Sequence, residues 1–351
     1  MMRHIKSDNI SNGETDSTTD AEESELQPTI PPSAVQFWTF LIFEIPSLAC
    51  TIFLLYHLIL NKRLRTALHN HIVMILLFLT LIIEIFDNPL YIDAYRLGGN
   101  MNSFALTPGI CLMWWFIDVG FYGAISVLLA WGALERHILV FHHHQLLRTR
   151  KQRLWIHYFP LSIISLYILV FYIIVIFFPP CTNVFNLESL ACGITPCYEQ
   201  VPLLNSWDYL GNGILCTFIE TVCSVALIVR VLWQKRRLHQ PMNWRKHRKM
   251  AVQILSISCI SLTIVFPQSL IIVIQQVGGP SMSNFGAGAM PYFFYLYTFV
   301  VFLLPFISLG CLPELWPKLL FFWPNRPSTV DIITPPQGAL GPSTIVRSRR
   351  T

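Results

Sequence analysis

Long apolar runs, separated by short polar segments, recur along the chain. A transmembrane helix needs about 20 mainly apolar residues, and seven runs reach that length. They are Phe37–Leu60, His71–Tyr95, Thr107–Phe141, Trp155–Phe178, Trp207–Trp233, Met250–Gln276 and Met290–Cys311. The alternating pattern of a β-barrel strand is not found. The pattern therefore predicts an all-α membrane protein with a seven-transmembrane helix bundle over residues 37–311.

The segments on either side of this bundle are polar. Residues 1–36 hold seven acids but only one lysine and one arginine, and they lack the apolar core of a cleavable signal peptide. We expect a disordered extracellular tail with a glycosylation sequon at Asn9. Residues 312–324 are short, amphipathic and rich in aromatics, which favours an eighth helix along the membrane surface. Residues 325–351 are expected to form a disordered cytoplasmic tail.

Charge is scarce in this sequence. Of the 351 residues, 54% are hydrophobic and 12% are charged, whereas soluble proteins carry about 25% charged residues. The surface of a water-soluble protein of this length could not be made from so few charges, which excludes a soluble enzyme as the leading interpretation. The formal net charge of +5 is too small and too scattered to indicate binding to nucleic acid.

Lysine and arginine gather in alternate loops. The loops after the first, third and fifth runs are basic, and the other loops carry little beyond Arg96. By the positive-inside rule the basic loops are cytoplasmic, which puts the N-terminus outside the cell and the C-terminus inside. We expect a multi-pass protein of the plasma membrane. The densest basic stretch, residues 235–249, is explained by topology alone, and it also suits the docking of an acidic partner or anionic lipid.

Four of the nine cysteines fall on the outer side: Cys111, Cys181, Cys192 and Cys197. Disulfides form and persist outside the cell, although the pairing of four cysteines is not fixed by sequence. We expect Cys111–Cys197 together with Cys181–Cys192, and Cys111–Cys192 is the alternative. A bridge from Cys111 would fasten the loop between the fourth and fifth runs to the start of the third.

Cys111 and Arg136 mark the two ends of the third run. They are 25 residues apart, or about 37 Å along an α-helix, which is enough to cross the membrane. This spacing and the triplet Glu135-Arg136-His137 resemble the rhodopsin-like (class A) G-protein-coupled receptors, and the resemblance covers roughly residues 37–322. In that family the third residue of the triplet is aromatic, and His137 replaces it here.

The resemblance implies a receptor for an extracellular ligand whose Arg136 meets a heterotrimeric G protein inside the cell. Glu135 beside it is expected to pair with Arg136, and breaking that pair would free the guanidinium. Pro267 and Pro305 look like the family's prolines in the sixth and seventh helices. The usual switch residues around them are missing, which marks a divergent branch. The alternative for Arg136 is anchoring at lipid headgroups by snorkelling.

Acids occur inside the predicted spans without basic residues at the same depth. A bare carboxylate at the centre of a membrane helix costs at least about 2.5–3.5 kcal/mol. Asp118 precedes Arg136 by 18 residues, which is five turns of an α-helix, so we expect both to face the bundle interior. In the resembling family an aspartate at this offset holds the cationic group of amines or of some peptides. The alternatives for Asp118 are a structural hydrogen-bonded acid and a protonation or ion site.

Further polar residues are candidates for the same ligand pocket. Glu84 and Asp87 are three residues apart and share a helical face, although a hydrogen bond between them explains their spacing equally well. Gln268 and Tyr295 are expected to contribute polar and aromatic groups. Tyrosines near helix ends more often form an interfacial belt, and that is the alternative for Tyr295.

The sequence predicts a G-protein-coupled receptor with an extracellular ligand, for which a cationic amine or peptide is the candidate. The alternative function is a cation transporter or channel that uses the intramembrane carboxylates, although no inverted repeat is found. An enzyme is the least favoured class, because the spans carry no metal motif and no Ser/His pair placed for nucleophilic work. We therefore expect no metal and no cofactor.

Overall fold

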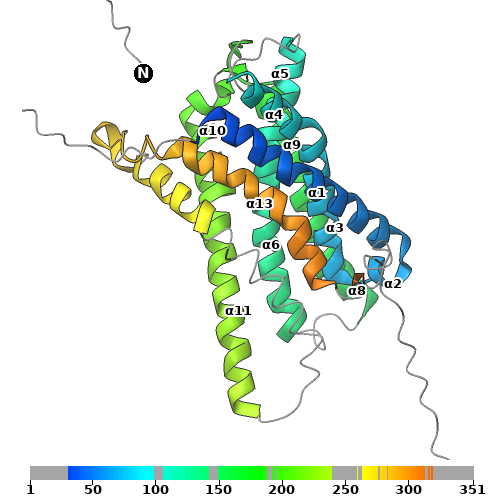
Figure 1. The fold of residues 1–351 in the computed structure, drawn as a ribbon. Coiled ribbons are helices and arrows are strands. Elements are labelled where there is room, and N and C mark those ends of the chain that lie inside the picture. Colours follow the sequence, from blue (N-terminus) through cyan, green and yellow to red (C-terminus); the bar gives the residue numbers. More distant parts are fainter. Residues whose placement is uncertain are drawn as a thin grey trace, which may run out of the picture. The chain divides into compact units, whose positions relative to one another are not determined.

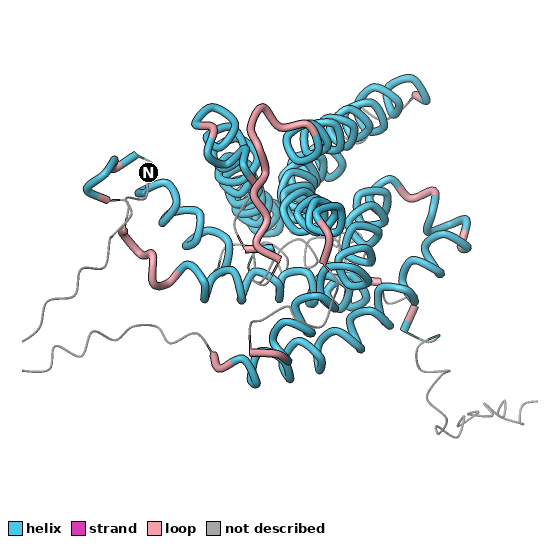
Figure 2. Tube along the Cα trace, turned by 90° about the horizontal axis from the view of Figure 1, so that it is seen from above, coloured by secondary structure: helices cyan, strands magenta, loops and turns pink. Residues whose placement is uncertain are grey.

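Helices make up the chain wherever its structure is described. The structure is a computed structural model, and it describes residues 31–98, 106–141, 149–187, 192–193, 196–238, 259, 263–275, 277–282, 284–312, 315–316 and 318. No β-strand occurs among these residues (Figure 2). Six helices in the described part are long and apolar enough to cross a membrane: Ser33–Leu60, Asn70–Arg96, Pro108–Ile138, Arg150–Phe177, Pro202–Leu227 and Met290–Cys311. The chain is thus an all-α, multi-pass membrane protein.

The seventh expected span is not confirmed. Of the run Met250–Gln276, the structure describes Cys259 and the apolar helix Thr263–Gln275, which is shorter than a span. Asn9 and residues 325–351 lie outside the described residues, as do most of the expected N-terminal tail and of the amphipathic helix. The chain divides into two compact units, residues 1–312 and 313–351, and the six candidate spans all belong to the first.

The six candidate spans coincide with six of the predicted runs. The first span is α1 (Ser33–Leu60), and the short α2 (Lys62–Arg65) follows it. The other elements are α3 (Leu68–Ile82), η1 (Ile83–Asp87), α4 (Asn88–Arg96), α5 (Pro108–Trp115), η2 (Phe116–Phe121), α6 (Tyr122–Phe141), α8 (Arg150–Arg153), η3 (Leu154–Tyr158), α9 (Phe159–Phe177), η5 (Cys197–Gln200), α10 (Pro202–Ser206), η6 (Trp207–Leu215), α11 (Cys216–Leu238), η7 (Gly279–Ser281) and α13 (Met290–Cys311).

Four of the long helices contain a π-helical segment: η1, η2, η3 and η6. A π turn closes its hydrogen bond between residues i and i+5, so it holds more residues than an α turn and changes the direction of the side chains beyond it. Each of these segments carries a polar side chain into the bundle, among them Glu84, Asp118, His157 and Asp208. Such segments are frequent at functional sites.

The bundle is held by close packing of neighbouring helices. α1 packs against α3, α4 and α13, while α6 packs against α3, α9 and α11 (Figure 1). Phe40 of α1 is 1% exposed, and its ring centroid lies 5.2 Å from that of Tyr95 and 5.8 Å from that of Tyr295. Because lipid tails are as apolar as these rings, the attraction comes from van der Waals contact rather than from exclusion of water.

The outer face of α9 is apolar. Ile163, Leu166, Val170 and Ile174 are spaced three or four residues apart, so they form one stripe along the helix, and they are 44–61% exposed. A stripe of exposed large apolar side chains is unfavourable in water and favourable against lipid. This face therefore agrees with a helix that crosses a membrane.

Candidate functional site

A cavity of about 630 Å³ lies within the bundle. Every one of the six candidate spans contributes to its wall, and so do the helix Thr263–Gln275 and the short helix η5. Pockets that hold small organic ligands occupy about 300–1,000 Å³ and commonly lie between the helices of a bundle. The cavity is therefore the candidate ligand site, and its polar side chains decide what it could bind.

Asp118 lies on the wall of this cavity. It belongs to the π-helical segment η2, and the hydroxyl of Tyr91 donates a hydrogen bond to its Oδ2 atom at 3.2 Å. The other carboxylate oxygen, Oδ1, accepts no hydrogen bond from the described residues. Asp118 thus lines the cavity, and its expected role in binding a ligand stays a prediction.

Tyrosine is the commonest residue type on the wall. Seven tyrosines line the cavity: Tyr91, Tyr95, Tyr122, Tyr172, Tyr209, Tyr295 and Tyr297. The face of an aromatic ring attracts a cation, because its π electrons make that face negative. The wall therefore combines carboxylates with aromatic rings, a combination that favours positively charged ligands over neutral or negative ones.

Two other residues that the sequence singled out also line the cavity. Gln268 is only 8% exposed and lies on the wall. Its amide offers both a donor and an acceptor, so it is placed to meet a polar group of a ligand. Tyr295 stacks on Phe40 and lies on the wall, so it is not part of an interfacial belt alone.

Asp208 is a wall residue that the sequence did not single out. It lies in η6, is buried, and accepts hydrogen bonds from the hydroxyls of Tyr172 and Tyr198 at 2.8 Å each and from the amide of Asn212 at 3.1 Å. Burial raises the pKa of the Tyr198 hydroxyl, so this group stays a donor. The sequence did offer one sign of this residue: Asp208 is an acid within the fifth predicted span, directly after Trp207.

Glu84 and Asp87 do not line the cavity with Asp118. Glu84 accepts a short hydrogen bond from Ser47 of α1, and Asp87 accepts one from the indole of Trp114 at 2.7 Å. Both acids are buried, and each keeps one oxygen without a partner, as does Glu44 of α1. No group of three His, Cys, Asp or Glu side chains in the described part of the chain is placed to hold a metal ion.

The disulfides differ from the favoured pairing. Cys111 is joined to Cys192, with 5.8 Å between their Cα atoms, and Cys181 is joined to Cys197, with 6.0 Å. The expected bridges Cys111–Cys197 and Cys181–Cys192 were wrong, and the alternative Cys111–Cys192 is confirmed. The reason is the path of the loop: Cys197 begins η5 and lies against the end of α9 near Cys181, while the loop between them reaches Cys111.

At the opposite end of α6, Glu135 contacts a histidine. The Nδ1 atom of His157, in η3, donates to Glu135 Oε1 through a short contact, and its Nε2 atom lies 2.8 Å from Nδ1 of His71, in α3. Glu135 and His157 are both buried. The described hydrogen-bond partner of the Glu135 carboxylate is therefore His157, where the sequence predicted Arg136.

Arg136 is itself only 8% exposed, so its side chain does not simply extend to the headgroup region. It lies within electrostatic reach of Glu135 and of Glu220 in α11. The next residue, His137, donates from Nε2 to the backbone oxygen of Cys223, also in α11, at 2.6 Å. The triplet thus joins α6 to two neighbouring helices.

The two candidate switch prolines are both inside helices. Pro305 lies in α13, and Pro267 lies in the helix Thr263–Gln275. A proline within a helix removes one backbone hydrogen bond and favours a bend. Neither proline lines the cavity, but Gln268 follows Pro267 directly and does.

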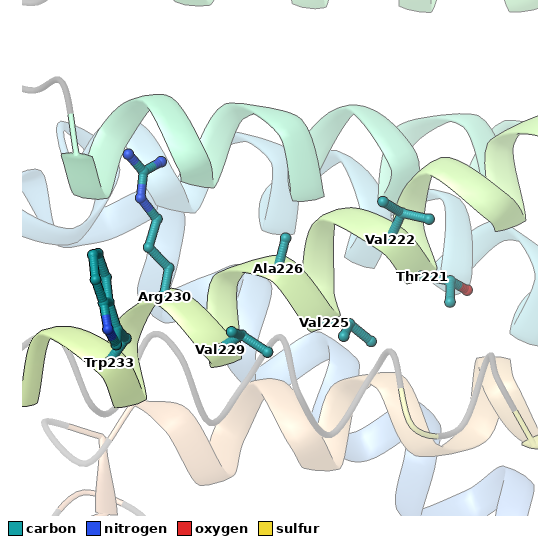
Figure 3. Close-up of a pocket in the computed structure, with 7 residues that line it drawn as sticks. All are labelled: Thr221, Val222, Val225, Ala226, Val229, Arg230 and Trp233. Atoms are coloured by element: carbon teal, nitrogen blue, oxygen red, sulfur yellow. The ribbon is translucent and has the colours of Figure 1, made fainter. Parts of the chain in front are cut away.

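A second hollow lies along α11 and has a different character. Its lining residues are Thr221, Val222, Val225, Ala226, Val229, Arg230 and Trp233. Figure 3 shows that these side chains all come from the one helix. With no carboxylate and mostly aliphatic side chains, this surface does not provide the convergent polar groups of a ligand site.

Comparison with known proteins gives no relative. No model of a protein family matches the chain, and no curated protein matches it either. The function is therefore inferred from the motif spacing in the sequence and from the geometry of the bundle.

Proposed function

We propose that the chain is a divergent rhodopsin-like G-protein-coupled receptor, in which a ligand in the cavity controls the binding of a heterotrimeric G protein at the Arg136 end. The resemblance in the third predicted span motivates the proposal. It includes a seventh span completed by residues 250–262 and an amphipathic helix over residues 312–324. It also includes the plasma membrane as the location, with the N-terminus outside the cell.

One observation carries the proposal: a single helix connects the two ends. The segments α5, η2 and α6 run without interruption from Pro108 to Phe141. Cys111 is tied by a disulfide near the start, Asp118 lines the cavity, and Arg136 is buried near the end. Cys111 and Arg136 are about 37 Å apart along the helix. A movement of this helix at the cavity would therefore also move Arg136.

A ligand acts in this proposal by preferring one packing of the helices over another. Because six spans contribute to the cavity wall, a ligand that draws Asp118 toward a group on another helix stabilises the arrangement in which that contact is made. At the other end, the same movement would change the surroundings of Glu135, Arg136 and Glu220. Exposure of Arg136 would then provide a cationic contact for the G protein.

The proposal is tested by nucleotide exchange. The full chain in nanodiscs is mixed with one heterotrimer from each G-protein class, and binding of a non-hydrolysable GTP analogue is measured alone and with tyramine, spermidine or a pool of basic peptides. We expect accelerated exchange with at least one class, and loss of that acceleration in Arg136→Ala. Arg63→Ala, in the exposed helix α2, is the matched control and should behave as wild type. Exchange no faster than with empty nanodiscs for every class, or unchanged in Arg136→Ala, would refute the proposal.

A cation transporter or channel is the second candidate, and the acids between α1 and η1 favour it. Glu44, Glu84 and Asp87 are buried, and each has an unpartnered oxygen. Such acids are typical of ion and proton pathways. Uptake of Na⁺, K⁺ or H⁺ into liposomes containing the chain tests this function. Uptake that is lost in Glu84→Gln and kept in Arg136→Ala would favour transport over signalling.

A further inference from the structure

Acids are buried where α1 meets η1 and α4. Glu44 of α1 and Glu84 and Asp87 of η1 are all buried, and no lysine, arginine or histidine pairs with them in the described part of the chain. The basic residues of α2 follow the end of α1, about 24 Å along the helix from Glu44, and Arg96 of α4 pairs with Asp93. An ionised carboxylate without a partner here is unfavourable by at least about 2.5–3.5 kcal/mol.

Asn88 indicates how Glu44 avoids this cost. Asn88 is 0% exposed, and its Nδ2 atom donates to Glu44 Oε2 at 2.7 Å. The other polar atom of each group, Asn88 Oδ1 and Glu44 Oε1, has no hydrogen-bond partner in the described structure. Both atoms only accept while the acid is ionised. A proton on Glu44 Oε1 would make this atom a donor to Asn88 Oδ1, so one proton satisfies both oxygens.

The hydroxyl of Ser47 gives a second, independent indication. It makes a short contact with Glu84 Oε1 and lies 3.0 Å from the backbone oxygen of Phe302 in α13. A hydroxyl carries one proton, whereas a carbonyl and an ionised carboxylate both only accept, so Ser47 cannot donate to both. Thr51, which is close to Glu84, donates to the backbone oxygen of Ser47 instead. If Glu84 is protonated, it donates to Ser47, and Ser47 donates to Phe302.

A bound metal ion is the other way to satisfy buried oxygens. However, no group of three His, Cys, Asp or Glu side chains among the described residues is placed to hold one. What is missing at each acid is a single donor: one for the pair Glu44 and Asn88, and one for the row Glu84, Ser47 and Phe302. Protons therefore explain these contacts better than a metal ion does.

The titratable side chains around these acids supply no positive charge. Asp87 accepts a hydrogen bond from the indole of Trp114 and is within electrostatic reach of Glu44 and Asp118. His71 of α3 lies at the other end of that helix, beside His157. The other titratable neighbours, from α1, α4 and α13, are Cys50, Tyr91, Tyr95 and Tyr295. Each of these groups is neutral or negative, so none of them favours ionisation of Glu44 or Glu84.

We propose that the contact between α1 and η1 is a proton-binding site, in which Glu44 and Glu84 are neutral acids that donate to Asn88 and Ser47. One proton then links α1 to α4, and the other links η1 through Ser47 to α13. Loss of these protons would leave two charges inside the bundle. Because the folded chain holds protons that the unfolded chain releases, its stability should fall as the pH rises. This inference goes beyond both proposed functions, and its test measures neither signalling nor uptake.

Infrared spectroscopy detects such protons directly. A protonated carboxyl group absorbs in a region where an ionised one does not, and its band shifts in heavy water. The full chain is measured at neutral pH in nanodiscs of ether-linked lipid, which has no ester carbonyl to mask this region. We expect one carboxylic-acid band to be lost in Glu44→Gln and one in Glu84→Gln. Asp93→Asn is the matched control: Asp93 is ionised in its pair with Arg96, so no such band should be lost.

Variants of the two acceptors test the assigned hydrogen bonds. Ser47→Ala removes the group that receives the Glu84 proton, and Asn88→Ala removes the group that receives the Glu44 proton. Each should move the band of its own acid to higher frequency, because a carboxyl group that loses its hydrogen bond has a stiffer carbonyl. The band of the other acid should stay in place. A purely structural role of Ser47 or Asn88 would not produce this selective movement.

Thermal unfolding gives the pH dependence. Between about pH 6 and about pH 9 the unfolding midpoint of the wild type in nanodiscs should fall by several degrees. The double variant Glu44→Gln with Glu84→Gln has no carboxyl proton to lose at this contact, so its midpoint should fall clearly less. Asp93→Asn should follow the wild type.

Three results would overturn the inference. The first is a difference spectrum of Glu44→Gln or Glu84→Gln without a lost band, and the second is an equal pH dependence of the wild type and the double variant. The third is failure of either glutamine variant to fold, because a glutamine amide has nearly the shape of the protonated acid and is also neutral. Nucleotide exchange has no part in these measurements, so failed exchange together with both bands would overturn the receptor proposal and keep the proton-binding site.

Discussion

Glu135 is held by His157 of the neighbouring helix, and the adjacent Arg136 is not its hydrogen-bond partner in the described structure. His157 Nδ1 donates to the carboxylate, and its second ring nitrogen meets His71. The chain Glu135–His157–His71 thereby joins three helices at the Arg136 end. Arg136 lies within electrostatic reach of Glu135 and Glu220, so in the proposed receptor its release would depend on α9 and α11 as well as on its own helix.

Replacing His157 should destabilise the bundle. His157→Phe leaves the buried carboxylate of Glu135 without its donor, which costs about 3 kcal/mol or more. We expect a clear drop in the thermal unfolding midpoint in nanodiscs, and partial recovery in the double variant His157→Phe with Glu135→Gln. His57→Phe is the control, because the described hydrogen bond and ring pairs of His57 are with Phe53 and Tyr56 of its own helix. An equal drop in both single variants would contradict the assigned role of His157.

Gly123 should tolerate no side chain. A Cβ atom at Gly123 would collide with the hydroxyl of Tyr172, the group that donates to Asp208. Gly123→Ala should therefore lower stability by about 1–3 kcal/mol. Gly132→Ala, on the same helix, would meet only Ile72 at 3.6 Å and should be neutral or slightly stabilising. The thermal unfolding midpoint in nanodiscs measures both effects. Equal behaviour of the two variants would count against the close fit of Tyr172.

Tyr91 should orient Asp118 for a cationic ligand. Tyr91→Phe removes the only described hydrogen bond to the Asp118 carboxylate, so the carboxylate becomes less well oriented for any cation. We expect the affinity for tyramine or spermidine, measured by the shift of the thermal unfolding midpoint, to fall a few-fold. Tyr95→Phe, at another wall position, should have the smaller effect. An equal loss in both variants would count against the role of the Tyr91 hydroxyl.

The two disulfides should differ in what they control. The bridge Cys111–Cys192 spans 81 residues and Cys181–Cys197 spans 16, and in the chain-entropy description the longer loop stabilises more, about 4.5 against about 3 kcal/mol. Replacing both cysteines of the long bridge by serine should lower the unfolding midpoint more. Replacing the pair Cys181 and Cys197 should affect ligand affinity more than its smaller loss of stability suggests, because this bridge positions η5, which contributes Glu199 to the cavity wall. Non-reduced peptide mapping should recover Cys111 linked to Cys192. Peptides linking Cys111 to Cys197 would contradict the pairing.

The apolar pattern predicted most of the architecture because a membrane-spanning helix is a local property of sequence. Six of the predicted runs coincide with the described spans, and the boundaries agree within about four residues, apart from the start of the fourth and the two ends of the fifth, which differ by five or six. The run Met250–Gln276 was predicted from the same signal, but the described part is too short to confirm it. The sequence also predicted that Asp118 lies on a pocket wall, because it follows Cys111 by only seven residues on the same span.

The π-helical segments were not available from the sequence. The prediction that Asp118 and Arg136 share a face assumed five α turns over 18 residues, but Asp118 lies within η2, whose turns hold more residues. Asp118 lines the cavity and Arg136 is buried, so both side chains face the bundle interior as expected. The count of α-helical turns does not explain why. Asp208 was overlooked because it lies near the end of its span rather than deep within it, although its place in an apolar run could have identified it.

The feature least predictable from the sequence was which side chains form hydrogen bonds and disulfides with one another. Glu135 has Arg136 beside it in sequence, yet its donor is His157, 22 residues away on another helix. The disulfide pairing likewise depended on the path of the loop after α9. Such contacts are set by how helices pack, and a single sequence without the packed structure does not specify them.

Glu199 reaches the cavity from a loop fastened at its base by Cys181 and Cys197. This part of the cavity wall is therefore completed only when the chain matures in an oxidising compartment. Protein produced in a reducing extract would keep Asp118 and its helices but not the fixed position of Glu199. Thiol chemistry during biosynthesis thus determines whether the mature protein carries a complete cavity wall.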